Sequence, residues 1–145
     1  MKTADLLDKA MRALASARLL LDSGDVDGAC NRAYYAMFDA ARSALLVTGA
    51  PTAPELAKTH GGLITAFSLH LVKTGQVPFE FGKALNRVAD IRLVADYTGD
   101  QVDIETARWA VGEAERFVTE LRRNLLLSAD KERDGADDEY PVKPG

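Results

Sequence analysis

The sequence predicts an all-α fold, an antiparallel up-down bundle of four to five helices. Three observations lead to it: apolar residues recur at helical spacing, glycine or proline stands where each periodic segment stops, and no alternating strand pattern of useful length occurs. The connections between the periodic segments are short, and short loops join antiparallel neighbours in a bundle. A chain of 145 residues is long enough for one domain with its own core.

Five helices are expected in chain order, and each stop carries a residue that helix ends favour. They are expected from about Thr3 to Ser23, from Asp25 to Thr48, up to the residue before Gly75, from near Pro78 to near Tyr97, and from Asp103 to Leu127. The expected N-caps, whose side-chain oxygens can accept a hydrogen bond from the first turn, are Thr3, Asp25 and Asp103.

The second of these helices shows the periodicity most clearly. One face carries apolar residues at helical spacing, namely Cys30, Ala33, Tyr34, Met37, Phe38, Ala41 and Leu45. Cys30 is therefore interpreted as a small core residue and not as a nucleophile. Another face carries Asn31, Tyr35, Asp39 and Arg42. That polar stripe is either a plain solvated face or the lining of a site or a subunit contact.

The fifth helix is interpreted as structural, with Trp109 and Phe117 among its apolar positions and Glu-to-Arg pairs on its outer face. The composition changes at residues 129–145, which hold six acidic and three basic residues and almost nothing to bury. The predicted organisation is thus a helical bundle over 1–128 and an acidic, flexible C-terminal tail over 129–145.

Composition and charge exclude several classes of protein. The formal net charge of -4 argues against a broad, non-specific nucleic-acid surface but leaves room for a local phosphate site. A single cysteine allows no intramolecular disulfide and no cysteine metal cluster, and it suits a reducing, cytoplasmic setting. No apolar run approaches the length of a membrane span and the N-terminus does not resemble a signal peptide, so no membrane association is expected.

Arg92 interrupts the apolar pattern of the fourth helix. With Phe81 at zero on an ideal helix, Arg92 lies at about 20°, near the middle of the apolar stripe, and Asp96 lies at about 60°, at its edge. Three interpretations remain. Arg92 bonds Asp96 and its head reaches the surface, or it pairs with a partner chain at a subunit seam, or it faces a cleft and binds an anion such as phosphate.

Tyr97 raises a separate question, because it lies at about 160° on the same ideal helix and so points away from Arg92. The two side chains can face one site only if the helix frays or tightens before the run Thr98-Gly99-Asp100.

Three segments carry a resemblance to a known family: RAYYAMFDAARSALL from Arg32, KTHGGLITAF from Lys58 and GKALNRVADIRLVADY from Gly82. In residue type and order they are similar to the HEPN domain family, named for higher eukaryotes and prokaryotes nucleotide-binding, and most of all to its compact prokaryotic branch of single-domain members. The resemblance covers nearly all of residues 3–127. It implies a bundle of four or five helices that forms a two-fold homodimer.

The resemblance also implies an activity. Many HEPN relatives are metal-independent ribonucleases, often toxins paired with a small nucleotidyltransferase antitoxin. Their site is an arginine, usually followed directly by a polar residue, with a histidine four to six positions beyond, and two such sites meet at the dimer seam. The arginine holds the scissile phosphate, and the histidine acts as acid or base for attack by the RNA 2′-hydroxyl.

Arg92 matches the family's arginine, but the residues after it depart from the pattern. Leu93 is apolar, and Tyr97 stands where the histidine would stand. Both histidines of the chain, His60 and His70, precede Arg92. A free tyrosine has a pKa near ~10 and is a weak base at neutral pH. The departure therefore counts against acid–base catalysis of the usual kind.

His60 is the one substitute that the sequence offers. It follows Thr59, an expected N-cap, so it would lie in the first turn of a helix, where the dipole keeps the ring neutral near pH 7. The preferred interpretation is a helix-end histidine that packs and caps, and proton transfer is the alternative. Neither histidine has cysteine or carboxylate companions at ligand spacing, so we predict no metal site and no cofactor.

The leading hypothesis is a HEPN-type protein of a prokaryotic toxin–antitoxin or defence module, acting as a metal-independent endoribonuclease at the seam of a homodimer. The residues predicted to form its catalytic site are Arg92, Tyr97 and Asp96, with His60, Tyr35 and Asn31 in support. The second hypothesis is a non-catalytic module that binds a nucleotide or RNA, or docks a small nucleotidyltransferase. A bare structural bundle is the third.

Overall fold

The computed structural model describes residues 3–50 and 59–126, and within these ranges the chain is helical and contains no strand. The helices are α1 (Thr3–Ser23), α2 (Val26–Val47), α4 (His60–Phe67), α5 (Phe79–Leu93) and α6 (Ile104–Leu121). Turns of π-helix extend three of them, namely η1 (Ser68–Val72), η2 (Val94–Thr98) and η3 (Arg122–Leu126). The predicted all-α bundle is confirmed, and the expected tail over 129–145 lies outside the described residues.

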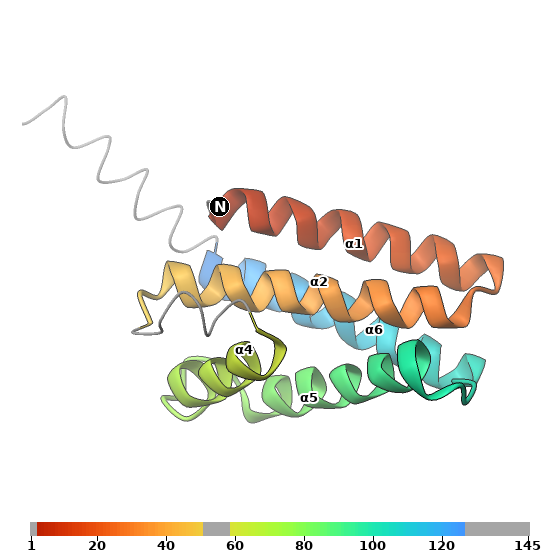
Figure 1. Cartoon of the computed structure of the whole chain (residues 1–145). Helices are drawn as coiled ribbons and strands as arrows, with labels where there is room; N and C mark the ends of the chain where they lie inside the picture. Colours follow the sequence, from red (N-terminus) through yellow and green to blue (C-terminus); the bar gives the residue numbers. More distant parts are fainter. Residues whose placement is uncertain (1–2, 51–58, 127–145) are drawn as a thin grey trace, which may run out of the picture.

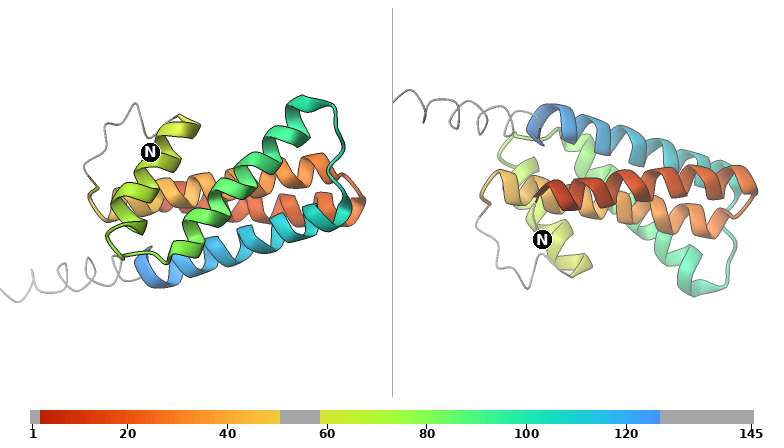
Figure 2. Two further views of the ribbon diagram at one scale, coloured as in Figure 1. Left: turned by 90° about the horizontal axis from the view of Figure 1, so that it is seen from below. Right: turned by 90° about the horizontal axis from the view of Figure 1, so that it is seen from above.

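The helices surround α2. Figure 1 shows α1 and α2 as an antiparallel pair, with α6 alongside and with α4 and α5 on the side of α2 opposite α1. Two further views show α5 crossing α2 obliquely and running antiparallel to α6 (Figure 2). α2 contacts α1, α4, α5 and α6. It is therefore the element against which every other helix is positioned.

Apolar side chains from all of these helices form one core. Its largest fully buried members include Tyr34, Met37, Leu63, Phe67 and Phe117. Each such burial stabilises the fold by roughly 1.5–3 kcal/mol, which exceeds what helix propensity contributes per residue. Six buried alanines let neighbouring helices approach α2 closely on several sides, namely Ala29, Ala33, Ala36, Ala40, Ala41 and Ala44.

Burial also tests two predictions about α2. Cys30 is fully buried, as expected of a core residue, and burial raises the pKa of its thiol to about 11. Asp39 is only 6% exposed, so the option of a plain solvated face is wrong at this position. Asp39 is buried because α2 has neighbours on several sides. Burial raises the pKa of its carboxyl, while the positive charges of Lys9, Arg42 and Arg32 lower it.

The helix ends follow local rules of capping. Asp25 accepts a hydrogen bond from the amide of Gly28 at 2.9 Å, and Asp103 accepts one from the amide of Thr106 at 2.7 Å. Both were expected N-caps. A Cβ at position 28 would lie 2.5 Å from Asp25 Oδ2, so glycine makes room for the first cap. Thr3, the third expected cap, is already helical where the described chain begins.

None of the described helices combines the length and the apolarity that crossing a membrane requires.

Candidate functional site

Arg92 lies near the end of α5 and is 5% exposed. Three tyrosine rings surround its guanidinium: Cζ is 4.8 Å from the ring centroid of Tyr34, 5.9 Å from that of Tyr35 and 5.8 Å from that of Tyr97. Such contacts stabilise a cation by about 0.5–2 kcal/mol each. The aromatic walls thus hold the charge in place without using its hydrogen-bond donors.

The polar partners of Arg92 are few. Nη1 donates to Asp96 Oδ2 at 3.4 Å, and the buried Nε has no partner among the described residues. The ion pair that the sequence suggested is therefore present. The expected escape of the head to the surface is not, because the side chain is only 6% exposed. A guanidinium in this position keeps unused N–H donors, which an oxyanion could accept.

Asp96 connects this arginine to α2. Its Oδ2 also accepts a hydrogen bond from Asn31 Nδ2 at 3.1 Å. The amide oxygen of Asn31 in turn accepts from Arg32, through Nε at 3.1 Å and Nη2 at 2.9 Å. Arg32 lies over the ring of Tyr35, with Cζ 5.1 Å from its centroid. Asp96 and Asn31 thus connect a second cation, Arg32, to Arg92 through hydrogen bonds.

Tyr97 reaches the site through η2. From the sequence, Tyr97 could face Arg92 only if the helix frayed or tightened here, but residues Val94–Thr98 form a wider π turn instead. Hydrogen bonds in a π-helix join residues five apart, so position 97 returns toward the side that carries Arg92. The hydroxyl of Tyr97 has no hydrogen bond among the described residues, and the residue is 73% exposed. The ring of Tyr97 therefore contacts the guanidinium of Arg92, while the rest of the residue faces solvent.

His60 approaches from α4. Thr59 caps this helix by accepting a hydrogen bond from the amide of Gly62 at 3.0 Å, so His60 is its first residue, as predicted. The imidazole packs against α2, with its ring centroid 5.4 Å from that of Tyr34, 5.8 Å from that of Tyr35 and 5.2 Å from that of Phe38.

A short hydrogen bond joins His60 to Tyr34: the hydroxyl oxygen and Nδ1 are 2.7 Å apart. Burial, and after it the charge of Arg92, lower the pKa of the imidazole. Burial is also the main reason why the pKa of Tyr34 rises to about 12. Near neutral pH the pair is therefore an uncharged imidazole and an intact phenol, which lie beside a permanent cation.

The structure thus brings six sequence candidates into one cluster, to which α2, α4, α5 and η2 all contribute. Their roles remain predictions. Two members of the cluster, Arg32 and Tyr34, were not predicted from the sequence; Tyr34 fitted the core pattern of the second helix completely. The two adjacent tyrosines that follow Arg32 on the same helix were the feature of the sequence that could have indicated both residues. His70 lies outside the cluster, on η1, where its carbonyl accepts hydrogen bonds from Thr74 and Gln76.

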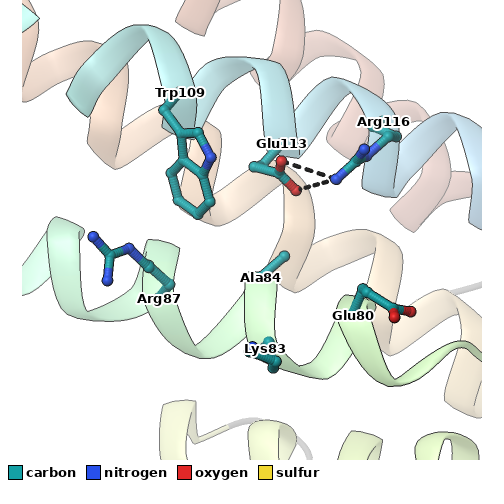
Figure 3. A pocket seen from close by; sticks show the side chains of 7 residues that line it. All are labelled: Glu80, Lys83, Ala84, Arg87, Trp109, Glu113 and Arg116. Carbon is teal, nitrogen blue, oxygen red and sulfur yellow. Dashed lines mark hydrogen bonds and ion pairs between the residues drawn. The ribbon is translucent and has the colours of Figure 1, made fainter. Parts of the chain in front are cut away.

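A separate hollow of about 360 Å³ lies between α5 and α6 (Figure 3). Its lining is formed by Glu80, Lys83, Ala84, Arg87, Trp109, Glu113 and Arg116. Arg87 lies over the ring of Trp109 at 5.6 Å, and Arg116 donates to Glu113 at 2.9 Å. Trp109, one of the apolar positions of the fifth helix, is 39% exposed and so does not belong to the core. Cations and anions alternate here, so the hollow offers less to an anion than the Arg92 cluster does.

Across residues 3–50 and 59–126, no three side chains of His, Cys, Asp or Glu gather as ligands for a metal ion would.

Comparison with known proteins gives the chain its relatives. The profile of the HEPN domain family matches residues 3–124. A UPF0332 protein of Gloeobacter violaceus is 33% identical over 79% of this chain and 88% of its own length. A protein of Methanocaldococcus jannaschii named "Putative toxin MJ0605" is 32% identical over 83% and 86%, respectively. A UPF0332 protein of Thermotoga maritima is 34% identical over 79% and 84%.

Proposed function

This chain belongs to the HEPN family, and we propose that it is a toxin-type member that cleaves RNA without a metal ion. The observation that carries the proposal is Arg92, a buried guanidinium with a single long bond to Asp96 and an unpartnered Nε. A buried charge with unmet donors is costly unless a ligand meets them. The name "Putative toxin" of the Methanocaldococcus jannaschii relative points to the same class of function.

In this proposal the scissile phosphate of RNA takes the open donors of Arg92. Phosphate is the anion that a planar guanidinium fork binds best, because two N–H groups can reach two of its oxygens. Arg32, held over Tyr35, adds a second positive charge for the neighbouring backbone. Exposed Tyr97 offers a ring face on which a base can stack.

RNA brings its own nucleophile to such a site. The 2′-hydroxyl can attack the adjacent phosphorus, so the protein has to supply charge stabilisation and proton transfer only. Arg92 provides the first of these in a setting where the surrounding rings exclude water. A charge held in a poorly hydrated site stabilises developing negative charge more strongly than one in bulk water.

The proposed functional unit is a homodimer. Leu93 and Tyr97, beside Arg92, are 45% and 73% exposed, and a second copy that covers them would close the site from outside. Two copies related by a two-fold axis would then place both Arg92 side chains near one seam.

A second candidate function is a non-catalytic module that binds RNA or a nucleotide, or docks a small nucleotidyltransferase. The observation in its favour is Tyr97, which stands where HEPN ribonucleases carry histidine and whose exposed hydroxyl has no partner among the described residues. It predicts stable binding of the nucleotide, RNA or partner with no cleavage under any condition.

The deciding experiment measures cleavage of single-stranded RNA by the purified protein in EDTA. We expect cleavage by the wild type and a loss of about 10²–10³-fold in Arg92→Ala, because one donor removed from an oxyanion site costs that much. Arg87→Ala is the matched control, an exposed arginine on the same helix that lies over Trp109. Undiminished cleavage by Arg92→Ala would refute the site, and RNA binding without any cleavage would support the second candidate.

A further inference from the structure

One aromatic side chain separates His60 from Arg92. The ring of Tyr34 carries the guanidinium of Arg92 on its face, with Cζ 4.8 Å from the centroid. Its hydroxyl meets His60 Nδ1 at 2.7 Å. Tyr34 itself is fully buried and belongs to α2, the central helix. The imidazole is therefore fixed relative to the arginine by a rigid ring and not by a mobile loop.

We propose that His60 is the general base of the proposed RNA cleavage and that Tyr34 is its positioning residue. The inference rests on RNA cleavage at Arg92. It replaces the interpretation of His60 as a residue that only packs and caps. Capping is already done by Thr59, whose side chain accepts from the amide of Gly62. Packing against the rings of α2 accounts for the position of the imidazole, but neither packing nor capping requires its hydrogen bond to Tyr34.

The tautomer of His60 across this hydrogen bond decides which nitrogen can act. A neutral imidazole has one N–H and one lone pair. When Nδ1–H donates to the oxygen of Tyr34, the lone pair is on Nε2, which has no hydrogen-bond partner among the described residues. The residue as a whole is exposed, so substrate can reach this ring from outside.

The proposed step conserves atoms and charge. Nε2 accepts the proton of the 2′-hydroxyl as the 2′-oxygen attacks phosphorus, and a 2′,3′-cyclic phosphate forms. The bond from phosphorus to the 5′-oxygen breaks, and that oxygen leaves as an alcohol after taking a proton from water. The imidazolium then returns its extra proton to the resulting hydroxide. No oxidant, reductant or co-reactant other than water is needed.

The charged and titratable surroundings of His60 set the direction of the pH dependence. They are Tyr34 and Tyr35 on α2 and Arg92 on α5, with Asp96 on η2 bonded to Arg92. Burial and Arg92 together keep the imidazole neutral at pH 7 by lowering its pKa. Because only the neutral ring is a base, activity should fall as the pH drops through that lowered pKa.

The test compares RNA cleavage in EDTA by wild type, His60→Gln, Tyr34→Phe and, as matched control, His70→Gln. We expect His60→Gln to lose about 10²–10⁴-fold in kcat with the acidic limb of the pH profile abolished, while RNA affinity changes little. Tyr34→Phe keeps the ring under Arg92, so it should lose roughly tenfold in kcat by releasing the imidazole. His70→Gln should behave as wild type.

A second readout does not depend on activity. The chain has two histidines, so His70→Gln leaves one imidazole to observe by ¹⁵N NMR. We expect the proton on Nδ1 in the native fold and a change of tautomer in the protein that also carries Tyr34→Phe. A native proton on Nε2 would overturn the base assignment, because Tyr34 would then occupy the only lone pair.

The outcomes distinguish the two proposals. Cleavage that depends on Arg92 but is unchanged in His60→Gln, with the same pH profile, overturns this inference and leaves the proposed function standing. Absence of cleavage in the wild type overturns both. Equal loss of kcat and of RNA affinity in His60→Gln assigns the residue to binding and rejects it as the base.

Discussion

Arg92 combines a permanent charge with near-complete burial, two properties that proteins usually keep apart. Three tyrosine rings offset part of the cost of burial, and Asp96 offsets another part through one long bond. The unpartnered Nε remains. A residue kept at such a cost is better explained by what it binds than by how it stabilises the fold.

This explanation gives a prediction about stability. Replacing a buried ion by an apolar side chain of similar length is often neutral or stabilising. The Met side chain has a similar length, so it can occupy the space between the three tyrosine rings and make favourable contacts with them. The free energy of unfolding of Arg92→Met should therefore lie within ~1 kcal/mol of the wild-type value, while RNA cleavage is lost. Denaturant unfolding followed by circular dichroism measures the difference.

Arg92→Ala is the comparison, because it leaves a cavity and should cost more than Arg92→Met. A loss of several kcal/mol in the free energy of unfolding of Arg92→Met itself would show that the arginine holds the bundle together, and would reject ligand binding as the reason for its burial.

At the scale of the element, η2 decides what surrounds Arg92. The π turn directs both Asp96 and Tyr97 toward the arginine, and it contains no buried residue of its own. Its conformation serves side-chain placement more than packing. Turns of this kind inside helices are frequent at functional sites.

Removing one residue from η2 tests this role. Deletion of Ala95 should return the segment to α-helical winding, with Asp96 three and Tyr97 four positions after Arg92, and so displace both side chains from their present contacts with the arginine. Cleavage should fall about 10²-fold, since a displacement near ~1 Å has that effect in preorganised sites. Stability should change by only ~1–2 kcal/mol, because no buried side chain is lost.

Deletion of Gln101, an exposed residue in the connection after η2, is the matched control. Equal activity in the two deletion variants would show that the π turn has no part in the site.

The elements differ in how well the sequence predicts them. Helix ends were predictable because caps and glycines act locally: Asp25, Asp103 and the left-handed Gly99 are each read from a few neighbours. The π turn was not predictable, because the residues of η2 pack against α2, which lies far away in sequence. An ideal 100° wheel therefore placed Tyr97 on the wrong side.

The difference between local and distant contacts also explains which site residues the sequence predicted and which it did not. Arg92 stood out because a single helix wheel exposes a charge in an apolar stripe. The pairing of His60 with Tyr34 spans 26 positions and exists only because α4 docks on α2. No local pattern encodes that docking, so Tyr34 was predicted as core and its second contact was missed.

At the scale of the whole molecule, the cluster is open on the side of Leu93 and Tyr97. The proposed homodimer covers that side, so dimerisation and cleavage should fail together. Leu93→Asp should shift the protein from the mass of two chains to that of one and lower cleavage by ~10-fold or more, because a buried unpaired charge disrupts an interface. Light scattering coupled to size exclusion measures the mass.

Leu19→Asp is the matched control, since Leu19 is 70% exposed on α1, away from the cluster. It should remain dimeric and active. A wild-type protein with the mass of one chain, yet fully active on RNA, would reject the seam.

The chain also contains an intrinsic reporter of local opening of its helical packing. Cys30 is the one thiol in the sequence, it is fully buried, and it directly precedes Asn31 on α2. With its pKa raised to about 11, almost none of it is thiolate while the fold is closed. A disulfide-exchange reagent can therefore react only when α2 separates from its neighbours. The rate of that reaction measures the free energy of opening of the helix on which the candidate site is built, with no introduced label.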